Sequence, residues 1–178
     1  MKKLFMISGV LTLAFGFLFI FGILDFNHTV GYVLAAGNRL YTEEDYNEAL
    51  EAYGPGLQKE PENPMLNYNA AQASYQVKAY DKAAEFYGKA SASVDLYLNW
   101  GNSFFRLGDG TEDANQKLQH FANALDTYKQ GILAFPQSVE LKYNYEYVLE
   151  KLKELQKNME NQPQNNQDNQ EDQDQNQQ

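Results

Sequence analysis

Hydrophobic and polar positions divide the chain into three parts. The run from Leu4 to Leu24 is uncharged and rich in Leu, Ile and Phe. From about Thr29 to Lys157, aromatic and small apolar residues alternate with charged ones, and from residue 158 onward almost every residue is Asn, Gln, Asp or Glu. Only the middle part can bury a core as a soluble domain, and its length favours a single domain.

A pattern of aromatic and small residues recurs within the middle part. Its copies consist of Tyr46, Ala49, Tyr53 and Gly56, then Tyr80, Ala83, Tyr87 and Ala90, and then Phe121, Ala124, Tyr128 and Gly131. The second copy follows the first by 34 residues at every position. A period of this length is typical of helix-turn-helix arrays, which bind other molecules more often than they catalyse reactions. The sequence therefore predicts an all-α fold of paired antiparallel helices.

Small residues are expected where the two helix backbones of one repeat come closest. They are Gly37, Ala71 and Gly101 on the first helices, and Ala49, Ala83, Ala124, Gly56, Ala90 and Gly131 on the second helices. The Tyr, Phe and Leu side chains between them fill the remaining volume with large apolar surface.

This order of small and aromatic residues, closed by Pro61 in the first copy and Pro136 in the third, resembles the tetratricopeptide repeat (TPR) family. The resemblance implies a helical solenoid of about three repeats, at residues 29–63, 64–94 and 95–136. Residues 137–157 are expected to form a C-terminal cap helix, with Ser138 as its N-cap and an apolar stripe along one face.

Three departures from the repeat pattern affect this prediction. Pro55 and Gly56 are expected to kink or shorten the second helix of the first repeat. The second repeat has Asp95 in place of a closing proline. The third repeat contains an insertion between its two helices, at residues 109–119, which forms either a loop or an extension of the helices.

The resemblance to TPR proteins also implies a concave surface lined by the first helices. The predicted peptide-binding groove consists of Asn38, Tyr41, Tyr68, Asn69, Gln72, Tyr75, Leu98, Asn99, Asn102, Phe105, Arg106 and Asn144. Asn and Gln offer donors and acceptors to an extended peptide, and Tyr and Phe supply apolar area. In the alternative, the aromatic residues complete the core and the Asn residues bond only between helices. Family members that clamp chaperone tails use Lys and Arg, whereas only Arg106 is basic here, so recognition of a carboxylate tail is not expected.

Composition and charge exclude several classes of function. The formal net charge of −10 argues against a nucleic-acid partner, because phosphate binding needs a clustered positive surface. With no Cys and two His, the chain lacks the residues for a thiolate or histidine metal cluster or for a histidine-assisted nucleophile. We therefore expect no enzyme activity, catalytic residue, cofactor, metal or small-molecule substrate. The alternatives are an envelope enzyme subunit that uses the acidic insertion and a chaperone-like assembly adaptor.

Residues 4–26 are predicted to form a transmembrane anchor. As a helix, the uncharged run is about 31 Å long, which matches the roughly 30 Å hydrocarbon core of a bilayer. Lys2 and Lys3 favour a cytoplasmic location for residues 1–3, and this orientation places the repeats on the extracytoplasmic side. The alternative is export followed by signal cleavage, although the apolar region of a signal peptide is usually only about 7 to 15 residues long.

The remaining tail, residues 158–178, is expected to be disordered because it cannot bury enough apolar area to offset the entropy of ordering. The whole layout, with one span, a short repeat array and a Gln-rich end, resembles the bacterial Bat (aerotolerance-operon) TPR proteins. That resemblance implies partners with von Willebrand factor A-type domains. The predicted function is a membrane-tethered scaffold that binds a segment of another envelope protein.

Overall fold

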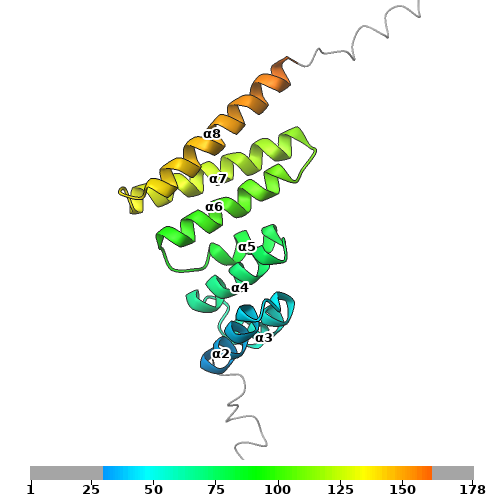
Figure 1. Cartoon of the computed structure of the whole chain (residues 1–178), viewed down its shortest axis with the longest axis vertical. Helices are drawn as coiled ribbons and strands as arrows, with labels where there is room; N and C mark the ends of the chain where they lie inside the picture. The colour runs from blue at the N-terminus through cyan, green and yellow to red at the C-terminus, as the bar shows by residue number, and fades with distance from the viewer. Residues whose placement is uncertain (1–29, 162–178) are drawn as a thin grey trace, which may run out of the picture. The chain divides into compact units, whose positions relative to one another are not determined.

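The computed structural model describes residues 30–161, which form seven α-helices and no strand. The chain divides after Ser91 into two compact units. Unit 1 contains α2 (Val30–Thr42), α3 (Tyr46–Lys59), α4 (Pro64–Gln76) and α5 (Tyr80–Tyr87). Unit 2 contains α6 (Val94–Asp109), α7 (Ala114–Ala134) and α8 (Val139–Glu160) (Figure 1). The predicted all-α fold is confirmed.

In unit 1, α2 packs against α3, α3 against α4, and α4 against α5. Helices α2 and α4 contribute aliphatic and small residues to the core, and α3 contributes an alanine and an aromatic ring. The buried core residues are Val33, Ala49, Tyr53, Leu66, Ala70 and Ala73. Asn63 fixes the start of α4, because its side-chain oxygen accepts hydrogen bonds from the backbone N–H groups of Met65 and Leu66 at 3.2 and 3.1 Å.

Glycines lie where helices come closest, as the pattern predicted. A Cβ atom added at Gly37 would overlap the ring of Tyr53, and one added at Gly101 would overlap the ring of Tyr128. At Gly56 the added atom would lie 2.6 Å from a methyl carbon of Val33. The small residues therefore give the aromatic rings room to pack against the neighbouring backbone.

The α2–α3 and α4–α5 turns of unit 1 have the same geometry. Glu44, in the α2–α3 turn, has φ 65°, and Lys78 occupies the corresponding position of the α4–α5 turn with φ 62°. Their backbone N–H groups donate to the carbonyl oxygens of Tyr41 and Tyr75 at 3.1 and 3.0 Å. The same two tyrosines make edge-to-face ring contacts with the first residues of the following helices, at centroid distances of 5.2 and 5.1 Å. The internal repeat is thus present in backbone conformation as well as in sequence.

In unit 2, α7 packs between α6 and α8, and α6 also contacts α8 (Figure 1). The buried core residues are Phe121, Ala124, Tyr128, Leu141 and Val148. Ser138 caps α8, because its hydroxyl accepts a hydrogen bond from the backbone N–H of Leu141 at 3.3 Å. This contact confirms the predicted N-cap, and the burial of Leu141 and Val148 confirms the predicted apolar stripe.

The structure resolves the two possibilities for residues 109–119 in favour of helix extension. Only residues 110–113 connect α6 to α7, and α7 begins at Ala114. Asp113 caps α7, because its Oδ1 accepts hydrogen bonds from the backbone N–H groups of Asn115 and Gln116 at 2.8 and 3.0 Å. The negative charge of this carboxylate is also stabilised by the positive N-terminal end of the helix dipole.

Three predicted helix boundaries differ from the structure. Pro55 lies inside α3, which continues to Lys59, so the expected shortening is wrong. In contrast, α5 ends at Tyr87 and Ala90 lies outside any helix. The cap helix α8 continues to Glu160, so residues 158–160 are helical and do not belong to the tail.

The C-terminal helix α8 corresponds to α4. Each residue of α4 has its equivalent in α8 75 positions later in the sequence. Both helices follow a capping residue, and Leu66 and Leu141 are buried at equivalent positions. However, α4 packs against α5 and buries Asn67 and Ala71, whereas α8 has exposed Lys142 and Glu146 at these positions. The face of α8 that would receive another helix is therefore charged.

The predicted anchor at residues 4–26 and most of the predicted tail lie outside the described residues. Among residues 30–161, no helix combines the length and the apolar character needed to cross a membrane.

Candidate functional site

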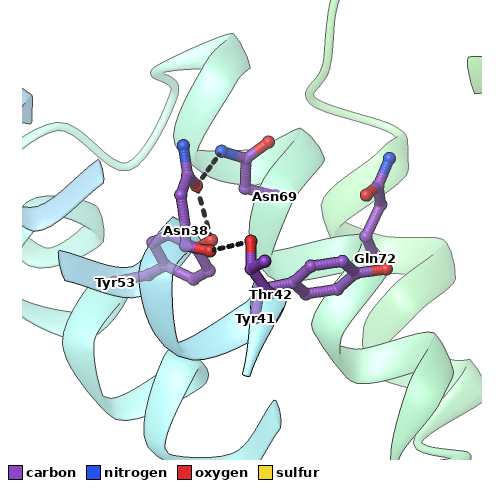
Figure 2. A pocket seen from close by; sticks show the side chains of 6 residues that line it. All are labelled: Asn38, Tyr41, Thr42, Tyr53, Asn69 and Gln72. Carbon is purple, nitrogen blue, oxygen red and sulfur yellow. Dashed lines mark hydrogen bonds between the residues drawn. The ribbon is translucent and has the colours of Figure 1, made fainter. Parts of the chain in front are cut away.

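A hydrogen-bonded cluster of one tyrosine and two asparagines links the helices of unit 1. The side-chain oxygen of Asn38, on α2, accepts a hydrogen bond from the hydroxyl of Tyr53, on α3, at 2.7 Å. The same oxygen accepts a second hydrogen bond, from the side-chain amide of Asn69, on α4, also at 2.7 Å (Figure 2). Because both bonds end on one oxygen, the carboxamide of Asn38 is held in a single orientation.

This orientation leaves polar groups facing outward. The amide nitrogen of Asn38 and the amide oxygen of Asn69 point away from their shared contact (Figure 2). Neither has a hydrogen-bond partner within residues 30–161. The side-chain amide of Gln72 is likewise without a partner in this part of the chain, so three carboxamides offer donors and acceptors on one side of α2 and α4.

These side chains surround a hollow of about 230 Å³. It is lined by Asn38, Tyr41, Thr42, Tyr53, Asn69 and Gln72 (Figure 2). The hydroxyl of Tyr41 also accepts a hydrogen bond from the side-chain amide of Gln76 at 3.4 Å, which is a second link between α2 and α4. The hollow combines an aromatic wall with amide groups, which suits a peptide segment better than an ion.

Unit 2 contains the same cluster. The side-chain oxygen of Asn102, on α6, accepts hydrogen bonds from the hydroxyl of Tyr128, on α7, at 2.7 Å and from the amide of Asn144, on α8, at 3.3 Å. In each unit, a glycine directly precedes the accepting asparagine and lies against the tyrosine ring. The glycine therefore lets the ring approach closely enough for its hydroxyl to reach the asparagine.

The second repeat departs from this arrangement. It has Ala71 and Gln72 at the positions of the glycine and asparagine, and its buried Tyr87 packs edge to face against Tyr68 at a centroid distance of 5.9 Å. Burial, followed by the neighbouring tyrosines Tyr68, Tyr41 and Tyr75, raises the pKa of Tyr87. Burial, with a smaller effect of Tyr41, raises the pKa of Tyr53 to about 12. Both tyrosine side chains are therefore neutral at physiological pH.

Half of the predicted groove residues lie in each unit. In unit 1, Asn38, Tyr41, Asn69 and Gln72 line the hollow, whereas Tyr68 and Tyr75 pack against other tyrosines. In unit 2, Asn102 and Asn144 are bonded to each other, Phe105 stacks on Phe121 at 5.5 Å, and Leu98 packs against the core. Asn99 is half-buried and Arg106 is exposed, both on α6. A single groove that includes all of these residues remains a prediction.

Sequence reasoning did not include three residues that belong to these sites. Tyr53 and Thr42 line the hollow of unit 1, and Tyr147 of α8 contacts Phe105 with a centroid distance of 5.6 Å. The repeat pattern predicts only a core position for Tyr53. A signal was present for Tyr147, because it follows Asn144 by three residues just as Gln72 follows Asn69.

Two acidic residues, Asp113 and Glu154, make structural contacts. Among the residues that the structure describes, no group of three or more His, Asp or Glu side chains is arranged to hold a metal ion. Asp113, in the acidic connection between α6 and α7, caps a helix. Lys151 pairs with Glu154 on the exposed face of α8, and the resulting hydrogen bond raises the pKa of Lys151.

Comparison with known proteins identifies the type of repeat. Residues 34–95 match the model of the tetratricopeptide repeat family. A small glutamine-rich tetratricopeptide repeat-containing protein of Mycosarcoma maydis is 28% identical over 108 residues, which cover 61% of this chain and 29% of that protein. The Hsp70-Hsp90 organising protein of Plasmodium falciparum is 39% identical over 49 residues, which cover 28% of this chain and 9% of that protein. The chain thus spans less than a third of the length of these relatives.

Solved structures agree in fold. The first TPR domain of the human RPAP3 protein is 22% identical, with a TM-score of 0.58, and the match covers 73% of this chain and 97% of that domain. A TPR protein of Thermus thermophilus is 20% identical, also with a TM-score of 0.58, and the match covers 72% and 69% of the two chains. The first TPR of Spaghetti (RPAP3), bound to the HSP90 peptide SRMEEVD, is 21% identical with a TM-score of 0.56 and covers 72% and 98%. The described helices therefore share the fold of these TPR domains.

Proposed function

We propose that this chain is a membrane-tethered interaction scaffold that binds an extended segment of a partner protein along the carboxamide and aromatic side chains of its repeats. The observation that supports the proposal most is the recurrence of one cluster, at Asn38, Tyr53 and Asn69 and again at Asn102, Tyr128 and Asn144. The α4–α5 pair has no such cluster of its own, so the packing of a helix pair does not require one.

The chemistry of the cluster fits a polypeptide ligand. An extended peptide presents one N–H donor and one carbonyl acceptor per residue. The unbonded amide nitrogen of Asn38, the amide oxygen of Asn69 and the carboxamide of Gln72 provide matching acceptors and donors, and Tyr41 provides an apolar wall. Because the tyrosine hydroxyl and Asn69 hold Asn38 in place, little additional ordering is needed on binding.

The preferred segment in this proposal has no acidic end. The relatives include a TPR domain that binds the HSP90 peptide SRMEEVD and another that binds the HSP70 peptide SGPTIEEVD. In this chain, Glu43 and Glu44 are exposed and come directly after Thr42, which lines the hollow of unit 1. Arg106 is the one basic residue of the predicted groove. An acidic tail would meet like charges near the first cluster, so a neutral or basic internal segment is favoured.

Two fluorescently labelled peptides, SRMEEVD and its charge-reversed analogue SRMKKVK, provide a direct probe of this preference. Anisotropy titration of the full-length chain should give weaker binding for the acidic peptide. Tighter binding of the acidic peptide would overturn the preference while leaving the interaction role intact.

The interaction role itself is tested by site-specific photo-crosslinking in native membranes. A benzoylphenylalanine placed at Tyr41 or at Phe105 should capture partner protein, whereas the same group at Tyr32, which is exposed on α2 but does not line the hollow, is the matched control. In parallel, the triple substitution of Tyr41, Tyr75 and Phe105 by Ala should abolish co-purification of the partner while helical circular dichroism persists. Equal capture at all three sites, or undiminished recovery by the triple variant, would defeat the proposal.

The tether in this proposal is the apolar segment at residues 4–26, with the repeats outside the cytoplasm. The motivation is its length, which matches a bilayer. Alkaline carbonate extraction should leave the chain in the membrane pellet, and protease added to intact spheroplasts should remove the repeats. A product released into the medium would support the cleaved form.

A Bat-type role predicts von Willebrand factor A-type proteins among the crosslinked partners, and their absence from the captured set would remove that assignment.

A further inference from the structure

Tyr32, on the first turn of α2, is exposed at a position that is buried in two other helices. Leu66 on α4 and Leu141 on α8 occupy the equivalent position, and each exposes 0% of its surface, whereas Tyr32 exposes 54%. In all three helices this residue is the third of the helix. The ring of Tyr32 therefore lies at a core position that residues 30–161 leave half open.

The two leucines are covered by the end of the helix that precedes them. A Cβ atom added at Gly56, near the end of α3, would lie 2.9 Å from a methyl carbon of Leu66. One added at Gly131, near the end of α7, would lie 3.1 Å from a methyl carbon of Leu141. In both cases a turn of four residues, 60–63 or 135–138, joins the two helices. Because α2 is the first of the described helices, Tyr32 has no such neighbour among them.

The sequence before α2 repeats the sequence before α8. Residues 22–30 read Gly-Ile-Leu-Asp-Phe-Asn-His-Thr-Val, and residues 131–139 read Gly-Ile-Leu-Ala-Phe-Pro-Gln-Ser-Val. Five of these nine residues are identical, and Thr29 takes the place of the capping residue Ser138. Tyr32 follows Gly22 by ten residues, which is also the spacing between the glycine and the leucine in both other copies. Residues 22–29 therefore carry the pattern of a helix end, a four-residue turn and a cap.

The segment that ends at Asp25 is the occupant that suits this position. It is uncharged and apolar from Leu4 to Leu24, so it can cover an aromatic ring, and four residues separate it from α2, as in the other two turns. A glycine can receive a tyrosine ring, as Gly37 does for Tyr53. A second copy or a partner would have to compete with a segment that a short connection keeps at high effective concentration.

We propose that residues 19–25 form the last turns of a helix that packs on α2, with Gly22 against the ring of Tyr32, residues 26–29 as the turn and Thr29 as the cap of α2. The inference goes beyond the proposed scaffold, and it does not depend on whether residues 4–18 enter a bilayer. If they do, the first repeat is joined to its anchor by a packed contact and not by a flexible linker, and it keeps a fixed orientation with respect to the membrane.

The absence of cysteine from the sequence allows a direct test in the full-length chain, purified in detergent. A variant with Gly22→Cys and Tyr32→Cys should form a disulfide within one chain on mild oxidation, because the proposed contact brings the two positions together. The matched control combines Gly22→Cys with Gly31→Cys, which lies one residue earlier and about 100° around the helix. A Cβ at Gly31 has no neighbour within 4 Å, and its counterparts Met65 and Glu140 are exposed. Equal yields for the two pairs, or disulfides only between chains, would overturn the proposal.

A second test leaves Tyr32 in place. Gly22→Leu should push the ring of Tyr32 away, and hydrogen exchange in peptides that cover residues 30–40 should become at least about threefold faster, because the first turn of α2 opens more often. The control is Gly16→Leu, which adds the same side chain to the same segment. Exchange should not change in this variant, because the other two copies already have a leucine at this position, Leu50 and Leu125. Equal exchange in the two variants would contradict the contact.

Discussion

Gly37 lies directly against the ring of Tyr53, so closely that any side chain at this position would overlap the ring. The hydroxyl of the same ring bonds to Asn38, the residue that follows the glycine. Gly37→Ala should therefore lower the free energy of unfolding by about 1–3 kcal/mol, because the added methyl group displaces a fully buried ring. Urea denaturation followed by circular dichroism measures this change.

Gly31→Ala is the control for this prediction. It lies on the same helix, and an added Cβ would have no neighbour within 4 Å. Its stability should be unchanged or slightly higher, because alanine favours helix over glycine by up to about 1 kcal/mol. Equal effects of the two substitutions would show that helix propensity, and not the close contact, determines the outcome.

Alkaline pH should destabilise the fold through its buried tyrosines. Burial raises the pKa of Tyr53 to about 12 and also raises the pKa of Tyr87, compared with about 10 in an unfolded chain. The stabilisation is fully present below pH 10 and is lost as the pH rises toward 12, by up to about 1.4 kcal/mol per pH unit for each such tyrosine. Urea midpoints measured across this range should fall more steeply for the unaltered chain than for Tyr53→Phe, and parallel curves would contradict the assigned cause.

The two turns with left-handed residues should become more stable when these residues are replaced by glycine. Lys78 has a φ of 62° and Glu44 a φ of 65°, which cost a residue with a side chain about 1–2 kcal/mol. Lys78→Gly and Glu44→Gly should each raise the free energy of unfolding by up to about 1 kcal/mol, since the greater freedom of glycine in the unfolded chain offsets part of the gain. Glu43→Gly, one residue before the left-handed position, should lower it, and thermal denaturation distinguishes the three variants.

Two nearby asparagines should respond differently to substitution. The side-chain amide of buried Asn67 donates to the carbonyl oxygens of Pro61 and Asn63, both at 2.8 Å, and so fixes the α3–α4 turn. Asn67→Ala should cost about 1–3 kcal/mol, because the turn loses two hydrogen bonds. Asn69→Ala removes one bond in a solvated position and should cost less than about 1 kcal/mol, but it should weaken binding of the partner. A larger stability loss at residue 69 would mean that the cluster is mainly structural.

Much of the fold could be predicted because the repeat places glycine or alanine where a ring must approach a backbone, as at Gly37 and Gly101. The helix ends were less predictable. The 34-residue frame marked 109–119 as an insertion, and a frame does not distinguish a loop from a longer helix. Asp113 is the local signal for the start of α7, because Asp is a common N-cap residue. Conversely, Pro55 favours a helix end by its local chemistry, but α3 continues to Lys59. The contacts of α3 with α2 and α4 lie outside what a local pattern can predict.

For the candidate site, the residue types could be predicted but their connections could not. The repeat pattern predicts groove positions for both Asn38 and Asn69, yet their hydrogen bond joins residues 31 positions apart and depends on how α2 and α4 pack. For Tyr53, periodicity predicts a buried ring and does not show where its hydroxyl points. The predicted groove residues are divided between two compact units. This division depends on tertiary contacts, which the repeat pattern does not predict.

Lys142 and Glu146 on α8 also limit what can be built onto this protein. Because they replace the buried Asn67 and Ala71 of α4, a further repeat grafted after α8 would press its helix onto two charges, and neighbouring molecules stacked end to end would meet the same obstacle. An engineer who wished to lengthen the array, or to polymerise it into a filament, would first have to neutralise this terminal face.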